Sequence, residues 1–220
     1  MQNTQTISTN KIVIFLVFIC AALMASVFVF HSRQKPVQPA ISSDVGIIFP
    51  VARDIKSFDL VTTRNEKFSQ KNFYNHWTLL FFGFTHCSSV CPTTLDMMSR
   101  AYGSLHDKYP DLQVALVSLD PERDSLETLA KYTHSYHPDF IGVTGNIQQL
   151  HKLQSQLGIY SEKDAATQTT GSNYQIQHTS SIMLINPQGQ WVGLFRFGLK
   201  PDTFAQAFET GVNSLGVQSG

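Results

Sequence analysis

Two cysteines and one distant histidine are the residues of this chain whose types and spacing favour chemistry. Cys87 and Cys91 are four positions apart, a spacing that puts both sulfurs on one face of a helical turn. Two thiolates so placed can chelate a soft metal ion or close into a disulfide. Because Cys20 lies apart from them in an apolar segment, the pair is a candidate site and not part of a disulfide framework.

The cysteine pair lies between an apolar run and a predicted helix. Residues 78–84 read TLLFFGF, which is typical of a strand buried on both faces. Pro92 suits the first turn of a helix, because its missing N–H costs nothing there. We therefore expect the thiols between the carboxyl end of a central strand and a helix N-terminus. That position stabilises thiolates, and it is where ligands usually bind an open α/β sheet.

His178 is the candidate third ligand. It is expected to open an apolar strand over 179–185, after a polar stretch at 160–177 that we predict to be a long loop. If that strand lies beside the central one, the imidazole faces the cysteines. Two sulfurs and one imidazole suit copper(I) in a three-coordinate site, whereas zinc prefers four ligands and no fourth is evident. His86 adjoins Cys87 but is expected to point away from it, as a surface or supporting group.

A charged turn is expected at the same end of the sheet. Residues 120–124 read DPERD and follow a second apolar strand predicted over 112–119. They are either a helix cap with surface charges, with Asp124 or Ser125 as the cap, or a polar wall of the site or a docking patch. Asn173 and Tyr174, in the loop before the histidine, are candidates to close over a metal ion.

The order of the predicted elements indicates the fold. In chain order they are a short hairpin over 58–68, the strand 78–84, a helix over 92–108, the strand 112–119, a helix from 124 or 125 to 136, a strand over 140–143, a helix over 146–157, a hairpin of 180–185 with 191–197, and a helix over 202–212. This order predicts an α/β fold in which helices flank both faces of a mixed sheet. A cysteine pair at a strand-to-helix junction fits the thioredoxin-like arrangement.

The first 45 residues have a different composition from the rest. Residues 12–30 contain no charged side chain and would span roughly 28 Å as a helix, close to the thickness of a bilayer core. We predict one transmembrane anchor there, and the alternative is a cleaved signal peptide, whose apolar core is shorter. An N-terminal tail (1–11), a Pro- and Ser-rich tether (31–45) and a globular domain (46–215) complete the expected organisation. The formal net charge of zero argues against nucleic acid as a partner.

Three motifs in this order resemble the Sco/SenC family. They are GFTHCxxxCPxxL from residue 83, VSLDPERD from residue 117, and HT at residue 178 followed by an apolar strand and NPxG from residue 186. The resemblance covers roughly residues 46–213. It implies a membrane-tethered, thioredoxin-like protein that helps to assemble the copper centre of cytochrome c oxidase. It also implies copper as the bound metal, with Cys87, Cys91 and His178 as its ligands.

The chain departs from the family pattern beside these residues. The family usually has an aspartate between the cysteines, where Ser88 and Ser89 stand here, and often an aspartate before the histidine, where Gln177 stands. The loss of anionic neighbours should make the site less attractive to a cation and should stabilise thiolates.

The first functional hypothesis is a metallochaperone and not an enzyme. Its partners would be an upstream copper donor and cytochrome c oxidase subunit II or another copper-acceptor protein. It would be anchored in an inner membrane with its domain in the periplasm, the mitochondrial intermembrane space being the second choice. One alternative is a thiol-disulfide oxidoreductase, in which Cys87 attacks and Cys91 resolves. The other is a redox sensor that signals through the long loop.

Overall fold

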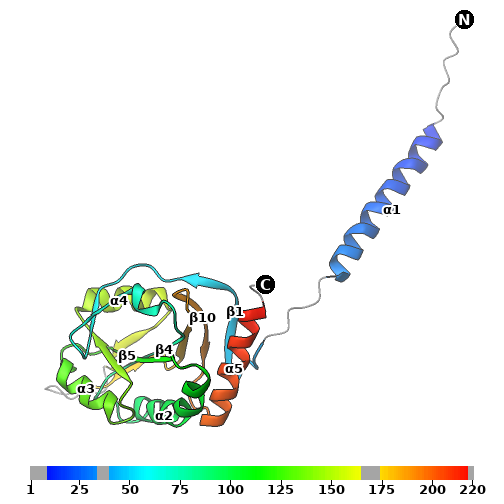
Figure 1. The fold of residues 1–220 in the computed structure, drawn as a ribbon. Coiled ribbons are helices and arrows are strands. Elements are labelled where there is room, and N and C mark those ends of the chain that lie inside the picture. Colours follow the sequence, from blue (N-terminus) through cyan, green and yellow to red (C-terminus); the bar gives the residue numbers. More distant parts are fainter. Residues whose placement is uncertain (1–8, 34–39, 165–173, 218–220) are drawn as a thin grey trace, which may run out of the picture. The chain divides into compact units, whose positions relative to one another are not determined.

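The structure, a computed structural model, describes residues 9–33, 40–164 and 174–217 (Figure 1). The chain forms two compact units, residues 1–38 and 39–220. The first unit contains the helix α1 (Thr9–Arg33). Within the described ranges no helix combines the length and the apolar character needed to cross a membrane, so the expected transmembrane anchor over 12–30 is not supported. The prediction for Asn173 and the middle of the predicted 31–45 tether, residues 34–39, lie outside the described residues.

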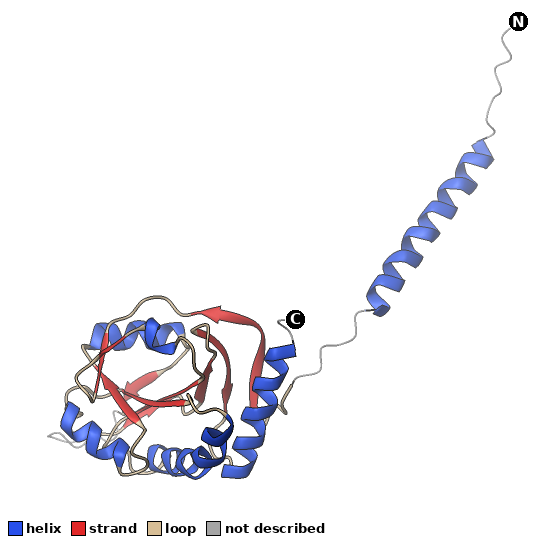
Figure 2. Cartoon of the chain, viewed as in Figure 1, coloured by secondary structure: helices blue, strands red, loops and turns tan. Residues whose placement is uncertain are grey.

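The second unit is built on an eight-stranded mixed sheet (Figure 2). Its strands are β1 (Gly46–Asp54), β10 (Gln190–Phe195), β9 (Ile182–Ile185), β4 (Thr78–Gly83), β5 (Gln113–Ser118), β6 (Ile141–Thr144), β2 (Leu60–Thr62) and β3 (Lys67–Phe68), in this spatial order. The strands β4, β5 and β6 are parallel, and β9 runs antiparallel to β4. All six residues of β4 are buried, because neighbouring strands and packed helices surround it.

Among the residues described for the second unit, five helical segments accompany the sheet: η1 (Gln70–Phe73), α2 (Val90–Lys108), α3 (Leu126–His134), α4 (Ile147–Gln156) and α5 (Pro201–Val217). One face of α2 is apolar and buried, as Leu95 and Leu105 show. Ser125 caps α3 by accepting a hydrogen bond from the backbone N–H of Thr128 at 3.1 Å. Because α2 and α4 lie on opposite sides of the strands (Figure 1), the expected thioredoxin-like α/β fold is confirmed.

Two regions differ from the sequence prediction. The edge strand β1 was not predicted, and its interior proline, Pro50, lies where its register with β10 is interrupted. The stretch expected to be a loop contains β7 (Ser161–Lys163) and β8 (Ile176–His178), which pair with each other. His178 therefore ends β8, whereas the prediction made it the first residue of the next strand. That strand, β9, begins only at Ile182.

Candidate metal centre

The two cysteines lie where β4 passes into α2. Cys87 is in the connecting loop and is half-buried, whereas Cys91 is in the first turn of α2 and is fully buried. The backbone N–H of Cys91 donates a hydrogen bond to Cys87 Sγ at 3.3 Å. Gly83 makes room for the inner thiol, since a Cβ at this position would lie 2.9 Å from Cys91 Sγ. The glycine at the end of the central strand thus allows the second cysteine to pack beneath the loop.

His178 reaches the cysteines from β8. Along this strand Ile176 is buried, Gln177 is exposed and His178 is half-buried, the alternation expected of extended chain. Nδ1 of the imidazole lies 2.9 Å from the carbonyl oxygen of Thr179. A carbonyl only accepts, so Nδ1 carries a proton, and Nε2 is the ring nitrogen available to a metal ion. Nε2 lies 3.8 Å from Cys91 Sγ, so this nitrogen faces the thiols.

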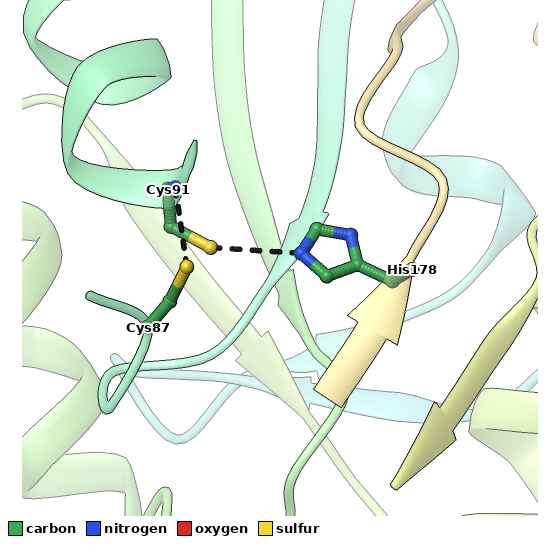
Figure 3. Close-up of side chains that lie close together, drawn as sticks. All are labelled: Cys87, Cys91 and His178. Atoms are coloured by element: carbon green, nitrogen blue, oxygen red, sulfur yellow. Dashed lines mark hydrogen bonds between the residues drawn. The ribbon is translucent and has the colours of Figure 1, made fainter. Parts of the chain in front are cut away.

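The three donor atoms converge at one point (Figure 3). Cys87 Sγ, Cys91 Sγ and a ring nitrogen of His178 all lie within 4.8 Å of one another. Within the described ranges, no other cluster of three or more cysteine, histidine or acidic side chains brings its donor atoms together in this way. The imidazole packs against the rings of Phe81 and Phe84, so an apolar wall backs the site. The arrangement offers two sulfurs and one neutral nitrogen to a single ion.

The two thiols differ in acidity. The pKa of Cys87 is lowered to about 4, chiefly by a hydrogen bond from the side chain of Cys91, against the opposing effect of burial. The same hydrogen bond and burial raise the pKa of Cys91. At neutral pH the metal-free site therefore holds one thiolate, at the half-buried position, and one thiol beneath it.

This difference predicts the pH dependence of alkylation. A cysteine of ordinary pKa loses thiolate tenfold per pH unit below about 8. Because the pKa of Cys87 is lowered, its thiolate persists as the pH falls, and its rate of reaction with iodoacetamide should stay nearly constant from pH 8 to about pH 5. Mass spectrometry of the reduced chain measures the rate at each site. In Cys91→Ala, which removes the side-chain donor, a steep pH dependence should return; a steep dependence already in the wild type would contradict the assignment.

Asp124 holds the start of the cysteine loop by hydrogen bonds. Its carboxylate is buried and accepts hydrogen bonds at 2.6 Å from the hydroxyls of both Thr85 and Ser118. It also accepts from the backbone N–H of Thr85 at 3.2 Å. The sequence offered Asp124 as a helix cap or a surface charge; Ser125 is the cap, and Asp124 instead joins the ends of β4 and β5. Burial raises the pKa of this carboxyl group.

The other candidate residues lie around the centre without joining it. The hydroxyl of Tyr174 donates to Asp120 Oδ1 at 2.6 Å, so the tyrosine binds the charged turn and does not close over the thiols. His86 is exposed, and its Nδ1 lies 3.1 Å from the hydroxyl of Thr85. The three positions at which the chain departs from the family pattern, Ser88, Ser89 and Gln177, are all exposed. Their side chains are uncharged, and the three donor atoms still lie together.

The fold and the site together define a thioredoxin-like protein with a dithiol–imidazole centre. The family model described as SCO1/SenC matches residues 51–213, and the chain belongs to this family.

Individual relatives agree with the family assignment. A protein of Stutzerimonas stutzeri named for copper binding is 38% identical over 157 residues, which cover 71% of this chain and 76% of the relative. The crystal structure of Arabidopsis thaliana ScoI with copper bound superposes with a TM-score of 0.67 at 26% identity, over 72% of this chain and 98% of the other. Yeast Sco1 with copper bound also gives a TM-score of 0.67 at 26% identity, over 74% and 90%.

Proposed function

We propose that this protein binds one copper(I) ion through Cys87 Sγ, Cys91 Sγ and His178 Nε2 and passes it to an acceptor protein. The observation that carries the proposal is the convergence of these three donor atoms within 4.8 Å. Sulfur and imidazole ligands favour a soft monovalent ion. The names of the relatives support the same metal, since they record copper bound to two proteins of the same fold.

The local chemistry prepares the site for binding. Cys87 is already a thiolate at neutral pH because its pKa is lowered. Only the Cys91 proton must therefore leave when the ion binds. The Thr179 carbonyl holds the imidazole in the tautomer that presents Nε2. Cys87 is the more exposed thiol, so an acceptor's ligand would reach the metal from this side.

The proposal also covers the acceptor protein and the compartment in which the domain works. Membership of the SCO1/SenC family supports cytochrome c oxidase subunit II, or another protein with a copper centre, as the acceptor, and an upstream protein as the donor. A domain that serves such an acceptor would work in the periplasm, or alternatively in the mitochondrial intermembrane space. Affinity capture with the copper-loaded chain, against the metal-free chain as control, would identify the acceptor by its dependence on metal.

The test of the proposal is an anaerobic titration of the reduced chain with copper(I) against a chromogenic competitor. The wild type should bind one equivalent. His178→Ala should retain the dithiol but bind about 10- to 100-fold more weakly, because one of three ligands is lost. His151→Ala, which removes an exposed histidine of α4, is the matched control and should titrate like the wild type. Equal affinity in His178→Ala and the wild type would refute the three-ligand site.

The unequal exposure of the two thiols favours a second candidate function, the reduction of a target disulfide. The half-buried Cys87 thiolate would attack one sulfur of the target, forming a mixed disulfide and releasing the other target sulfur as a thiolate, which takes up a proton. Cys91 would lose its proton and attack Cys87 Sγ, forming the Cys87–Cys91 disulfide and releasing the second target thiolate. The target gains two electrons and the protein loses two.

The requirement for His178 distinguishes the two functions. Reduction of a target needs both cysteines but no imidazole, so His178→Ala should reduce a model disulfide at the wild-type rate if this second function holds. A chain that binds copper but forms no mixed disulfide, trapped with Cys91→Ser, would exclude the reductase function. A histidine variant deficient in both assays would contradict the separation.

A further inference from the structure

The strand that carries the histidine is not part of the main sheet. Among the described strands, β8 pairs only with β7, in a separate two-stranded ribbon. The cysteines, by contrast, lie in the loop after β4 and in the first turn of α2. The distance from the imidazole to the thiols therefore depends on the contacts that attach this ribbon to the rest of the domain.

Tyr174, four residues before His178, provides one such attachment. Its ring is buried, and its hydroxyl donates a hydrogen bond of 2.6 Å to Asp120 Oδ1. The guanidinium of Arg123 lies 3.6 Å from the centre of the tyrosine ring and donates from Nη2 to the Tyr174 carbonyl oxygen at 3.0 Å. Asp120 and Arg123 also form an ion pair with each other. Each of the three residues thus contacts the other two.

Burial makes this contact specific. The side chains of Asp120 and Arg123 are only 1% and 10% exposed. A buried ion pair is stable only if hydrogen bonds satisfy its remaining polar atoms, and the tyrosine hydroxyl satisfies one oxygen of Asp120. A second, exposed pair joins the same parts of the chain, since Lys163 of β7 lies 3.0 Å from Glu122 of the charged turn.

Gln175, the residue after Tyr174, attaches this segment to the cysteine loop. Its Nε2 donates to the carbonyl oxygen of His86 at 3.2 Å, immediately before Cys87. From there the chain is extended through β8, so that Ile176 and His178 face inward. Extended chain advances about 3.3 Å per residue, and a segment this short transmits a displacement of its start to the imidazole.

We infer that the buried contact of Asp120, Arg123 and Tyr174 positions His178 Nε2 beside the two thiols. None of the three supplies a donor atom to the centre; they act through the backbone of residues 174–178. The inference rests on the proposed copper function and adds to it the residues that determine how strongly the imidazole contributes. The DPERD turn then supports the histidine, in addition to the link that Asp124 makes between the ends of β4 and β5.

The variant that tests this is Tyr174→Phe in the full chain. It keeps the ring that lies against Arg123 and removes the hydroxyl that binds Asp120. We expect copper(I) affinity to fall about 10-fold or more, the effect typical of losing a residue that orients a ligand. The matched control is Tyr160→Phe, which removes an exposed hydroxyl bonded to Glu162 near the start of β7 and should leave the affinity unchanged.

A double-mutant cycle shows whether the effect passes through the histidine. In a His178→Ala background, Tyr174→Phe should cause no further loss of affinity, because the imidazole that it positions is gone. An equal loss in both backgrounds would mean a general structural role and would overturn the inference. Wild-type affinity in Tyr174→Phe, with a clear loss in His178→Ala, would overturn the inference alone and leave the proposed function standing. If His178→Ala itself left the copper affinity unchanged, both the inference and the proposed three-ligand site would be refuted.

Discussion

Cys91→Ser should lower the copper(I) affinity of the reduced chain on the order of 1,000-fold, which corresponds to about 4 kcal/mol. The variant loses the inner sulfur, which lies 3.8 Å from His178 Nε2, and a serine hydroxyl is a poor ligand for a soft ion. The serine hydroxyl can still donate a hydrogen bond to Cys87 Sγ, so the pKa of Cys87 should stay lowered and the loss of affinity reports the missing sulfur. Competition titration with a copper(I) chelator measures this loss.

Cys20→Ser is the control for this substitution. It removes an exposed cysteine from α1, outside the unit that carries the site, so copper affinity and stoichiometry should not change. Circular dichroism of Cys91→Ser should show the wild-type fold, since serine is slightly smaller than cysteine and fits the same position. Tight one-to-one binding by folded Cys91→Ser would show that the inner thiol is not a ligand.

Asp124→Ala should lower the free energy of unfolding by about 3 kcal/mol and Tm by roughly 6 to 12 °C. The substitution leaves the hydroxyls of Thr85 and Ser118 and one backbone N–H of Thr85 without their carboxylate partner. These groups are partly or fully buried, and water cannot replace the acceptor without opening the junction of β4 and β5. Thermal unfolding of the metal-free chain, monitored by circular dichroism, is the measurement.

Two further variants serve as controls for Asp124→Ala. Asp124→Asn keeps one acceptor oxygen and a similar shape, and should recover a large part of the lost stability. Glu127→Ala removes an exposed carboxylate of α3 that pairs with Lys131 at 2.7 Å, and should change stability by less than about 1 kcal/mol. If Asp124→Ala unfolded at the wild-type temperature, the hydrogen bonds of Asp124 to the ends of β4 and β5 would not stabilise the fold.

The sequence was sufficient for the parts of the fold with strong local patterns. The apolar run that forms β4 and the spacing of Leu95, Met98 and Leu105 along α2 identify these elements directly, and the structure buries all of them. The glycine at the end of β4 and the proline in the first turn of α2 mark where the cysteine loop lies. Local chemistry therefore predicted the position of the thiols.

The sequence could not reveal contacts that join distant segments. β1 is an edge strand with a proline and partly exposed residues, so it has no clear alternation. β7 and β8 are three residues each and are defined by pairing across the intervening segment. The bonds from Asp124 to Thr85, and from Tyr174 to Asp120, link residues 39 and 54 positions apart. Nothing in the residues themselves indicates such partners.

The most direct test of the central claim is X-ray absorption at the copper edge of the copper(I)-loaded chain, compared with His178→Ala. The proposed site predicts two sulfur ligands and one imidazole nitrogen in the wild type, and the loss of the imidazole scattering alone in the variant. Identical spectra from the two proteins, or a wild-type site with sulfur ligands only, would contradict the account.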